Sequence, residues 1–462
     1  MKRMSLQCML AALGMACLAA AADLQINTTT RWDQKDPDLA ADANGRGVIV
    51  WNSTRQDGDS GGIFARRIDP NGPTGPEFQV NAVAAGNQAE PSAAVNDLGV
   101  FMVVWRGPWP GSDAEDIVAR VFDPNGQPMT EDLHINTHAA ARQGYARVAA
   151  GAAGRFFVVW ESDSAPDVNH LCIRGQLIDQ TGHPLGPEIA VSDTPSYAAR
   201  YPDVAIDGQG RVAVSWMEDR TTDAVRGRLF DADGKPKAAS FKVNTISFKS
   251  LTWPSIAMNA EGSFVVAWDG DPKKSSDDDV HVRIYGAEGN PAGDEIQVNA
   301  TSAGAQVNPR VAIDDQGEFI VVWTSPSGDP NHGTDVMGQR FDAQGQRMGD
   351  ESRLNHFTAG DQGQPDVTLG NDGRFLVVWE SVGQDGSGSG ISGMPGPRPL
   401  SAGLNSDGVV NFLDYEVLAS QWGKTGSGWR ADLVDNDAVD WTDVAAFSGQ
   451  WLAHPATDAS VD

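Results

Sequence analysis

Tryptophan recurs at nearly constant intervals through most of this 462-residue chain. Successive copies lie 52 to 56 residues apart, and each ends an apolar run, as at residues 101–105 and 319–323. The seven copies are Trp51, Trp105, Trp160, Trp216, Trp268, Trp323 and Trp379. A period of this length restricts the chain to a repeat architecture, in which each unit buries its apolar surface against its neighbours.

Each interval repeats the same order of four short strands. In one unit, extended segments at 201–206, 211–216, 225–230 and 241–244 are separated by polar turns that contain glycine. Such a unit predicts a four-stranded antiparallel sheet. Its second strand is almost continuously apolar, which predicts burial on both faces. The tryptophan at the end of that strand is therefore expected to pack between units.

The two ends of the repeat region predict how it closes. Residues 24–27 match the fourth strand of a unit, whereas the last unit ends soon after Trp379. The amino-terminal strand is therefore expected to complete the last unit, giving a mainly β, seven-bladed β-propeller over residues 23–390. The third strand of that last unit has only residues 390–393 to form it, so an open array is the alternative. This region resembles secreted bacterial repeat β-propellers.

The amino terminus predicts export. Lys2 and Arg3 precede an apolar stretch that ends in small residues at 20–22, as in a cleaved signal peptide over residues 1–22. No other apolar stretch is long enough to span a bilayer, so a secreted, extracellular or cell-surface protein is expected. Removal of the leader leaves Cys172 as the one cysteine, which excludes an intramolecular disulfide. The net charge of −28 argues against nucleic acid as a partner.

A different kind of sequence follows a linker at 391–402 that is rich in glycine, serine and proline. Residues 403–455 contain two acidic loops, each followed by a helical pattern, at an offset of 29 residues: Asp414 aligns with Asp443, and Trp422 with Trp451. This duplicated segment resembles a type I dockerin. The resemblance implies a small all-α domain with EF-hand-type loops that bind Ca²⁺ and helices that dock onto a cohesin-like partner.

The calcium ligands implied by this resemblance are Asn405, Asp407, Asn411 and Asp414 in the first loop, and Asp432, Asn436, Asp440 and Asp443 in the second. Both loops depart from the pattern, because Gly403 and Val434 stand where ligands are expected and Asp437 replaces the glycine of the bend. Helix capping is the alternative role for these acids. The positions that contact cohesin correspond to Phe412, Leu413, Trp441 and Thr442. Packing inside the small domain is the alternative role for them.

The propeller region offers two sets of candidate site residues and no recognised catalytic motif, so its catalytic residues stay unidentified. Aromatic residues outside the repeat position should emerge on one face and could stack on sugar rings or anchor a protein, unless they pack within loops. These are Trp32, Trp109, Trp253 and Tyr201, accompanied by Tyr145 and Tyr197. Loop carboxylates form the second set, for calcium or paired-carboxylate catalysis, with a solvated surface as the alternative. Its members include Asp57, Asp59, Asp113, Glu115, Asp116, Asp219, Asp269, Asp271 and the run 277–279.

Together these features predict an exported protein whose propeller binds a carbohydrate or a protein and whose carboxyl-terminal module tethers it to an extracellular assembly. Two alternatives stay open. The propeller could be a glycoside hydrolase or another polysaccharide-degrading enzyme, or it could be a structural or adhesion component of the cell surface without a ligand.

Overall fold

The computed structural model describes residues 23–396, apart from residue 71 and segments 139–141, 152–153, 164–169, 195, 221–222, 247–250, 272–276 and 330–331. The predicted signal peptide and the dockerin-like segment at 403–455, with all its calcium and cohesin positions, lie outside the described residues. Leu24–Gly396 forms one compact unit. In the described part of the chain, no helix is long and apolar enough to cross a membrane.

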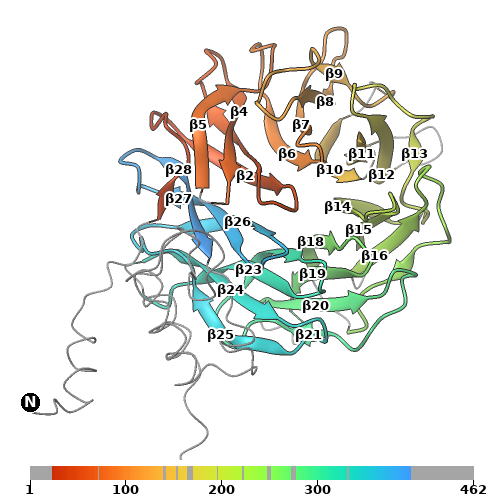
Figure 1. The fold of residues 1–462 in the computed structure, drawn as a ribbon, viewed down its shortest axis with the longest axis vertical. Coiled ribbons are helices and arrows are strands. Elements are labelled where there is room, and N and C mark those ends of the chain that lie inside the picture. Colours follow the sequence, from red (N-terminus) through yellow and green to blue (C-terminus); the bar gives the residue numbers. More distant parts are fainter. Residues whose placement is uncertain are drawn as a thin grey trace, which may run out of the picture. The chain divides into compact units, whose positions relative to one another are not determined.

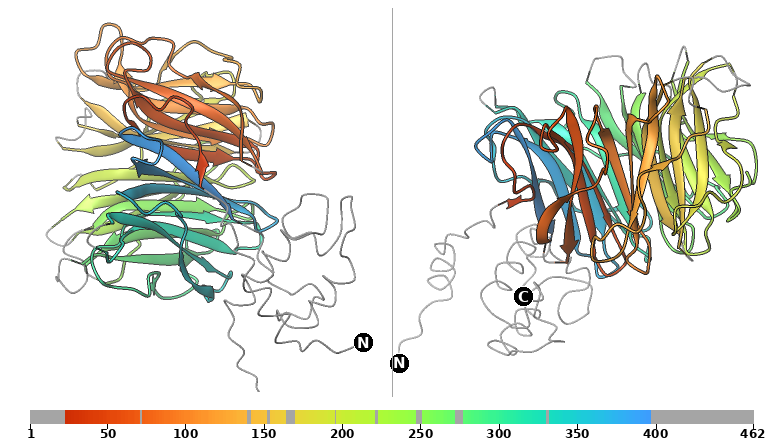
Figure 2. Two further views of the ribbon diagram at one scale, coloured as in Figure 1. Left: turned by 90° about the vertical axis from the view of Figure 1, so that its left-hand side faces the viewer. Right: turned by 90° about the horizontal axis from the view of Figure 1, so that it is seen from above.

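Seven four-stranded antiparallel sheets make up this unit, and they stand around a common axis (Figure 1). Side views show neighbouring sheets packed face to face (Figure 2). The repeat therefore forms the seven-bladed β-propeller that the tryptophan spacing predicts. In each blade the first strand lies nearest the axis and the fourth lies outermost (Figure 1).

The strands of the first three blades follow the chain in order. Blade one contains β2 (Gln34–Ala41), β3 (Gly47–Thr54), β4 (Gly61–Asp69) and β5 (Gly72–Gln79). Blade two contains β6 (Ala89–Val95), β7 (Phe101–Pro108), β8 (Glu115–Phe122) and β9 (Leu133–His134). Blade three contains β10 (Gln143–Gly151), β11 (Arg155–Ser162), β12 (Cys172–Asp179) and β13 (Ile189–Ala190).

The remaining blades keep this order until the last. Blade four contains β14 (Ala198–Ile206), β15 (Val212–Asp219), β16 (Ala224–Phe230) and β17 (Phe241–Lys242). Blade five contains β18 (Leu251–Met258), β19 (Phe264–Gly270), β20 (Asp279–Tyr285) and β21 (Ile296–Gln297). Blade six contains β22 (Val307–Ile313), β23 (Phe319–Pro326), β24 (Thr334–Phe341) and β25 (Arg347–Arg353). Blade seven contains β26 (Gln362–Leu369), β27 (Phe375–Val382), β28 (Ser389–Gly396) and β1 (Leu24–Gln25).

Blade seven closes the ring with strands from both ends of the propeller. Leu24 pairs with Gly393, and the Ile26 N–H donates to the Ile391 carbonyl at 2.9 Å. The side chain of Asn27 completes the junction, because its Oδ1 accepts the backbone N–H of Ile391 at 2.7 Å. The ring is therefore closed, and the open array is excluded.

The third strand of blade seven is longer than the sequence pattern suggests. All eight residues of β28 pair with β27, so the strand spans Ser389–Gly396 rather than the four residues 390–393. Its glycines allow close contact with neighbouring side chains: a Cβ on Gly396 would lie 2.0 Å from the Phe375 ring. The segment forms a strand because the ladder is made by backbone groups, which need no apolar pattern.

The core lies between the blades. The second strands are buried on both faces, and all seven repeat tryptophans are fully buried. Trp160 packs in one cluster with Met102, Val104 and Ile117 of the preceding blade. Its indole N–H donates to Gln143 at 3.0 Å. The repeat tryptophan is thus a packing residue between blades, as its recurrence predicts.

Candidate functional site

Each inner strand has a β-bulge near its beginning. The pairing register with the second strand shifts at this point in all seven blades. The bulged residue adopts a left-handed conformation, with φ between 46° and 56°. These residues are Asp36, Glu90, Tyr145, Tyr201, Trp253, Asn308 and Gln364, and proline follows six of them. This conformation costs a non-glycine residue about 1 kcal/mol or more. Because every blade contains it, the strain belongs to the repeat, and only the side chains differ between blades.

A second set of equivalent positions lies two residues further along the inner strands. It comprises Asp38, Ser92, Arg147, Asp203, Ser255, Arg310 and Asp366. The Asp38 carboxylate accepts the backbone N–H of Ala93 in the next blade at 2.7 Å. Asp366 accepts the N–H of Leu39 in the same way at 2.6 Å. These aspartates therefore join neighbouring inner strands around the axis.

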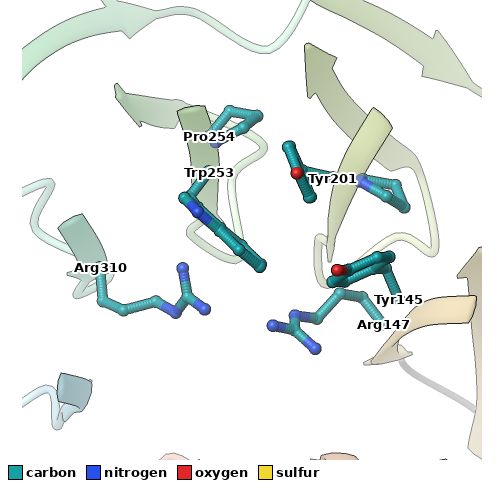
Figure 3. Close-up of a pocket in the computed structure, with 7 residues that line it drawn as sticks. Tyr145, Arg147, Tyr201, Trp253, Pro254 and Arg310 are labelled. Carbon is teal, nitrogen blue, oxygen red and sulfur yellow. The ribbon is translucent and has the colours of Figure 1, made fainter. Parts of the chain in front are cut away.

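Three consecutive blades place aromatic side chains at the bulge, where they meet. The rings of Tyr201 and Trp253 stack with centroids 4.4 Å apart and an interplanar angle of 25°. Tyr145 contacts both rings edge-on, at 5.2 Å from Tyr201 and 5.6 Å from Trp253. All three side chains are partly exposed. They form one aromatic surface beside the axis (Figure 3).

Two arginines complete this group, which we call the axial cluster: Tyr145, Arg147, Tyr201, Trp253 and Arg310. Both arginines line the same pocket as the aromatic rings. Figure 3 shows their guanidinium groups extending from different inner strands toward the same space beside Trp253. The cavity volume here is 10 Å³, enough for about one water molecule. The axial cluster is therefore a shallow surface rather than a deep pocket.

Two carboxylates support the aromatic residues from behind. Glu90 accepts the backbone N–H of Tyr145 at 2.9 Å and pairs with Arg106 at 3.2 Å. Glu161 accepts the backbone N–H of Tyr201 at 2.6 Å. Burial raises the pKa of the Glu161 carboxyl to about 7, although the hydrogen bond from Tyr201 acts in the opposite direction. Glu161 thus changes its charge near neutral pH.

Replacing Glu161 with Gln is expected to flatten the dependence of stability on pH. Between about pH 4.5 and 7 the folded protein keeps a proton on Glu161 that the unfolded chain has released. The wild-type free energy of unfolding therefore falls as the pH rises through this window, by on the order of 1 to 3 kcal/mol relative to Glu161→Gln. Urea denaturation of both proteins at pH 5 and pH 8 measures the difference. Parallel pH profiles would show that Glu161 is ionised throughout.

The structure brings some of the predicted aromatic residues together and separates others. Tyr201 and Trp253 are neighbours in the axial cluster. Trp109 instead follows β7 in blade two and stacks on His134 of the outermost strand, with centroids 4.8 Å apart. There it lines a second pocket of 160 Å³. Trp32 precedes β2, and its ring contacts the Arg31 guanidinium at 4.2 Å.

The acidic loop residues lie outside the inner strands, and several already have partners. Glu115 pairs with Arg106 and with Arg142. Asp116 is buried and accepts a hydrogen bond from the Asn136 amide at 2.6 Å. The carboxylates that face the axis come from the inner strands instead, as Asp38 and Asp366 do. Within the described residues, no group of three or more His, Cys, Asp or Glu side chains is placed to hold a metal ion.

Sequence reasoning missed the two arginines and the inner-strand aspartates. The signal that marks them is the register of the bulge, since an X-Pro pair at the start of the unit repeats in six blades. Arg310 follows Asn308-Pro309 as Asp203 follows Tyr201-Pro202. Aligning the units on this position, where Ala146 replaces the proline in blade three, brings Arg147 and Arg310 to equivalent places in the ring.

Comparison with known proteins finds no family and only distant structural similarity. No protein-family model matches the sequence, and no curated protein does. Among solved structures, a protein of unknown function from Dyadobacter fermentans is similar at 13% identity, over 81% of this chain and 97% of that chain, with a TM-score of 0.46. An α-L-arabinanase from Penicillium chrysogenum in complex with arabinobiose is similar at 12% identity, over 66% and 93%, with a TM-score of 0.45. An ulvan lyase is similar at 11% identity, over 80% and 94%, with a TM-score of 0.49. At these values the likeness carries no argument about what this chain binds.

Proposed function

We propose that this propeller binds carbohydrate at the axial cluster. The observation that supports the proposal is the convergence of three aromatic side chains from consecutive blades with two arginines. The apolar C–H faces of a sugar ring pack on aromatic rings, while guanidinium and phenol groups bond its hydroxyls. Because the cavity holds only about one water molecule, the ligand is expected to lie across the mouth of the ring.

We propose in addition that the chain is exported and tethered through its carboxyl-terminal segment. This part rests on the sequence alone: the leader at 1–22 and the paired dockerin-like loops at 403–455. A cohesin-like extracellular protein is the proposed partner, with Phe412, Leu413, Trp441 and Thr442 at the docking positions. The propeller would then deliver a carbohydrate-binding surface to a larger assembly.

A hydrolase is the second candidate, and one observation favours it. Burial raises the pKa of the Asp366 carboxyl to about 7, and it also raises the pKa of Asp38, which lies on the inner strand of the next blade. A carboxyl that keeps its proton near neutral pH can act as a general acid toward a glycosidic oxygen. The same two carboxylates join inner strands through backbone N–H groups, so a purely structural role accounts for their position equally well.

One experiment separates the three functions. The purified chain is incubated with a panel of insoluble polysaccharides in calcium, and both protein depletion and released soluble sugar are measured. Depletion without release supports carbohydrate binding. Release that Asp366→Asn abolishes supports the hydrolase and overturns binding as the main function. If there is neither protein depletion nor sugar release, both the binding and the hydrolase functions are overturned, and the structural or adhesion role remains.

Calcium removal is expected to affect the carboxyl-terminal segment. The first loop retains the bend glycine, Gly408, whereas the second does not, so the first should bind Ca²⁺ more tightly. Titration calorimetry of the full chain should show calcium binding that Asp414→Ala weakens more than Asp443→Ala does. The absence of any calcium binding to the full chain would overturn the dockerin-like assignment, whereas a larger effect of Asp443→Ala would reverse the ranking of the loops.

A further inference from the structure

The two arginines of the axial cluster face each other across the mouth of the ring. Arg147 lies on β10 and Arg310 on β22, at equivalent positions two residues after the bulge. Figure 3 shows that their guanidinium groups point toward each other beside the Trp253 ring. Two like charges directed at one space repel each other, and the repulsion is strongest where water is displaced.

Within the described residues, each of these arginines makes one hydrogen bond through its guanidinium group. Arg147 Nη1 donates to the adjacent Ala146 carbonyl at 3.1 Å, and its positive charge acts on the carboxyls of Asp36 and Asp38. Arg310 donates to the Pro309 carbonyl at 3.3 Å, and its Nε lies 3.9 Å from Asp366 Oδ1. A guanidinium group has five N–H donors, so each arginine retains several for a ligand.

The nearby aspartates are held in place by other bonds. Asp38 accepts the N–H of Ala93, and Asp366 accepts those of Leu39 and Val367, at 2.6 and 2.9 Å. These bonds fix the positions of both carboxyls, and from there Asp38 interacts electrostatically with both arginines and Asp366 with Arg310. Burial raises the pKa values of both aspartates, while the positive charges of Arg147 and Arg310 lower that of Asp38 and the charge of Arg310 lowers that of Asp366.

We infer that the sugar recognised by the axial cluster carries an anionic group, either a carboxylate or a sulfate ester. This inference rests on the proposed carbohydrate function. The anionic group would bind between Arg147 and Arg310 while the sugar ring packs on Trp253. The planar guanidinium group matches two oxygens of such an anion with two parallel N–H donors. The anion would also relieve the repulsion between the arginines.

The negative charge of the whole chain does not oppose this inference at short range. The sequence carries a net charge of −28, but salt at physiological strength screens charges beyond about 8 Å. The two guanidinium groups that contact the anion therefore dominate its binding. The overall charge acts on the association rate, which should rise with added salt at low ionic strength.

The test compares charged polymers with their neutral counterparts. Polygalacturonate is paired with its methyl ester, and dextran sulfate with dextran, so that one pair reports on carboxylate and the other on sulfate. The full chain is assayed as wild type, Arg147→Gln and Arg310→Gln. Arg46→Gln is the matched control, because Arg46 is 62% exposed in the turn at the far end of β2 and its loss changes the net charge equally.

The wild type is expected to bind one charged polymer at least about tenfold more tightly than its neutral counterpart. Each axial arginine variant should lose most of that preference, while Arg46→Gln should keep it. Thermal unfolding of each variant shows whether it is folded. Preference retained in both folded arginine variants overturns the inference. If the wild type binds charged and neutral polymers equally, the inference about the anionic group is overturned, but the proposed carbohydrate function is not. If the wild type binds no glycan, both are overturned.

Discussion

Replacing Ile26 with Asp is expected to destabilise the propeller by at least about 4 kcal/mol. Ile26 is fully buried between blade seven and blade one, in a cluster with Leu39, Trp51 and Val378. The substitution removes apolar burial and places a carboxylate where no partner is available in the cluster. Because strand β1 closes the ring, the damage should spread from blade seven to its neighbours. Denaturant unfolding and limited proteolysis of the two proteins measure the effect.

Gln25→Asp provides the matched control for this change. Gln25 is the last residue of β1 and directly precedes Ile26, but it is exposed. The same new charge at this position should change stability by less than about 0.5 kcal/mol. If Ile26→Asp is as stable as Gln25→Asp, closure by the amino-terminal strand does not hold the ring together, and the paired ends of blade seven are dispensable.

Replacing Trp253 with Asn is expected to weaken glycan binding at least about tenfold, because the axial cluster loses the aromatic surface on which the sugar stacks. The propeller is expected to stay folded. Blade six already carries Asn308 at this position, with φ of 56° against 46° for Trp253. The backbone of the repeat therefore accepts asparagine here. Tyr201→Gln introduces the residue that blade seven carries, Gln364, and should have a similar effect. Binding to the insoluble polysaccharide that depletes the wild-type protein from solution provides the measurement.

Trp109→Asn controls for the loss of a tryptophan elsewhere on the propeller. Trp109 is partly buried against His134 and lines the separate pocket in blade two. Its replacement should leave glycan binding at the axial cluster unchanged. The opposite pattern, with binding lost in Trp109→Asn and retained in Trp253→Asn, would move the ligand site to the pocket of blade two.

The spacing of tryptophan was enough to predict the blades, because one fully buried indole per unit fixes both the period and the interface between sheets. Closure was also predictable, since the amino-terminal segment matches a fourth strand. The extent of β28 was not, because its glycine-rich sequence lacks an apolar pattern and its pairing depends on the backbone alone. Apolar periodicity predicts which side chains are buried. It does not predict the length of a glycine-rich strand, because such a strand has few side chains to bury.

The site was only partly predictable. The sequence predicted that Tyr201 and Trp253 share a face of the ring, because they precede equivalent strands, and the structure shows that their rings stack. The sequence grouped Trp109 with them, but the structure separates it. Residues on one face meet only if they lie at a similar distance from the axis, and a position within a loop does not give that distance. Arg147 was missed because an isolated arginine in a strand has no motif of its own. Its role emerges only when the seven units are placed side by side.

The recurrent bulge separates what a blade needs for folding from what it displays. The same left-handed turn presents Asp, Glu, Tyr, Tyr, Trp, Asn and Gln in successive blades, so the backbone tolerates acidic, aromatic and amide side chains alike. The propeller thus provides seven equivalent bulge positions that accept different side chains on the same backbone. Exchanging residues between blades is therefore expected to change the chemistry beside the axis while the scaffold stays constant, and that chemistry depends on the seven bulge positions together with the seven positions two residues further on.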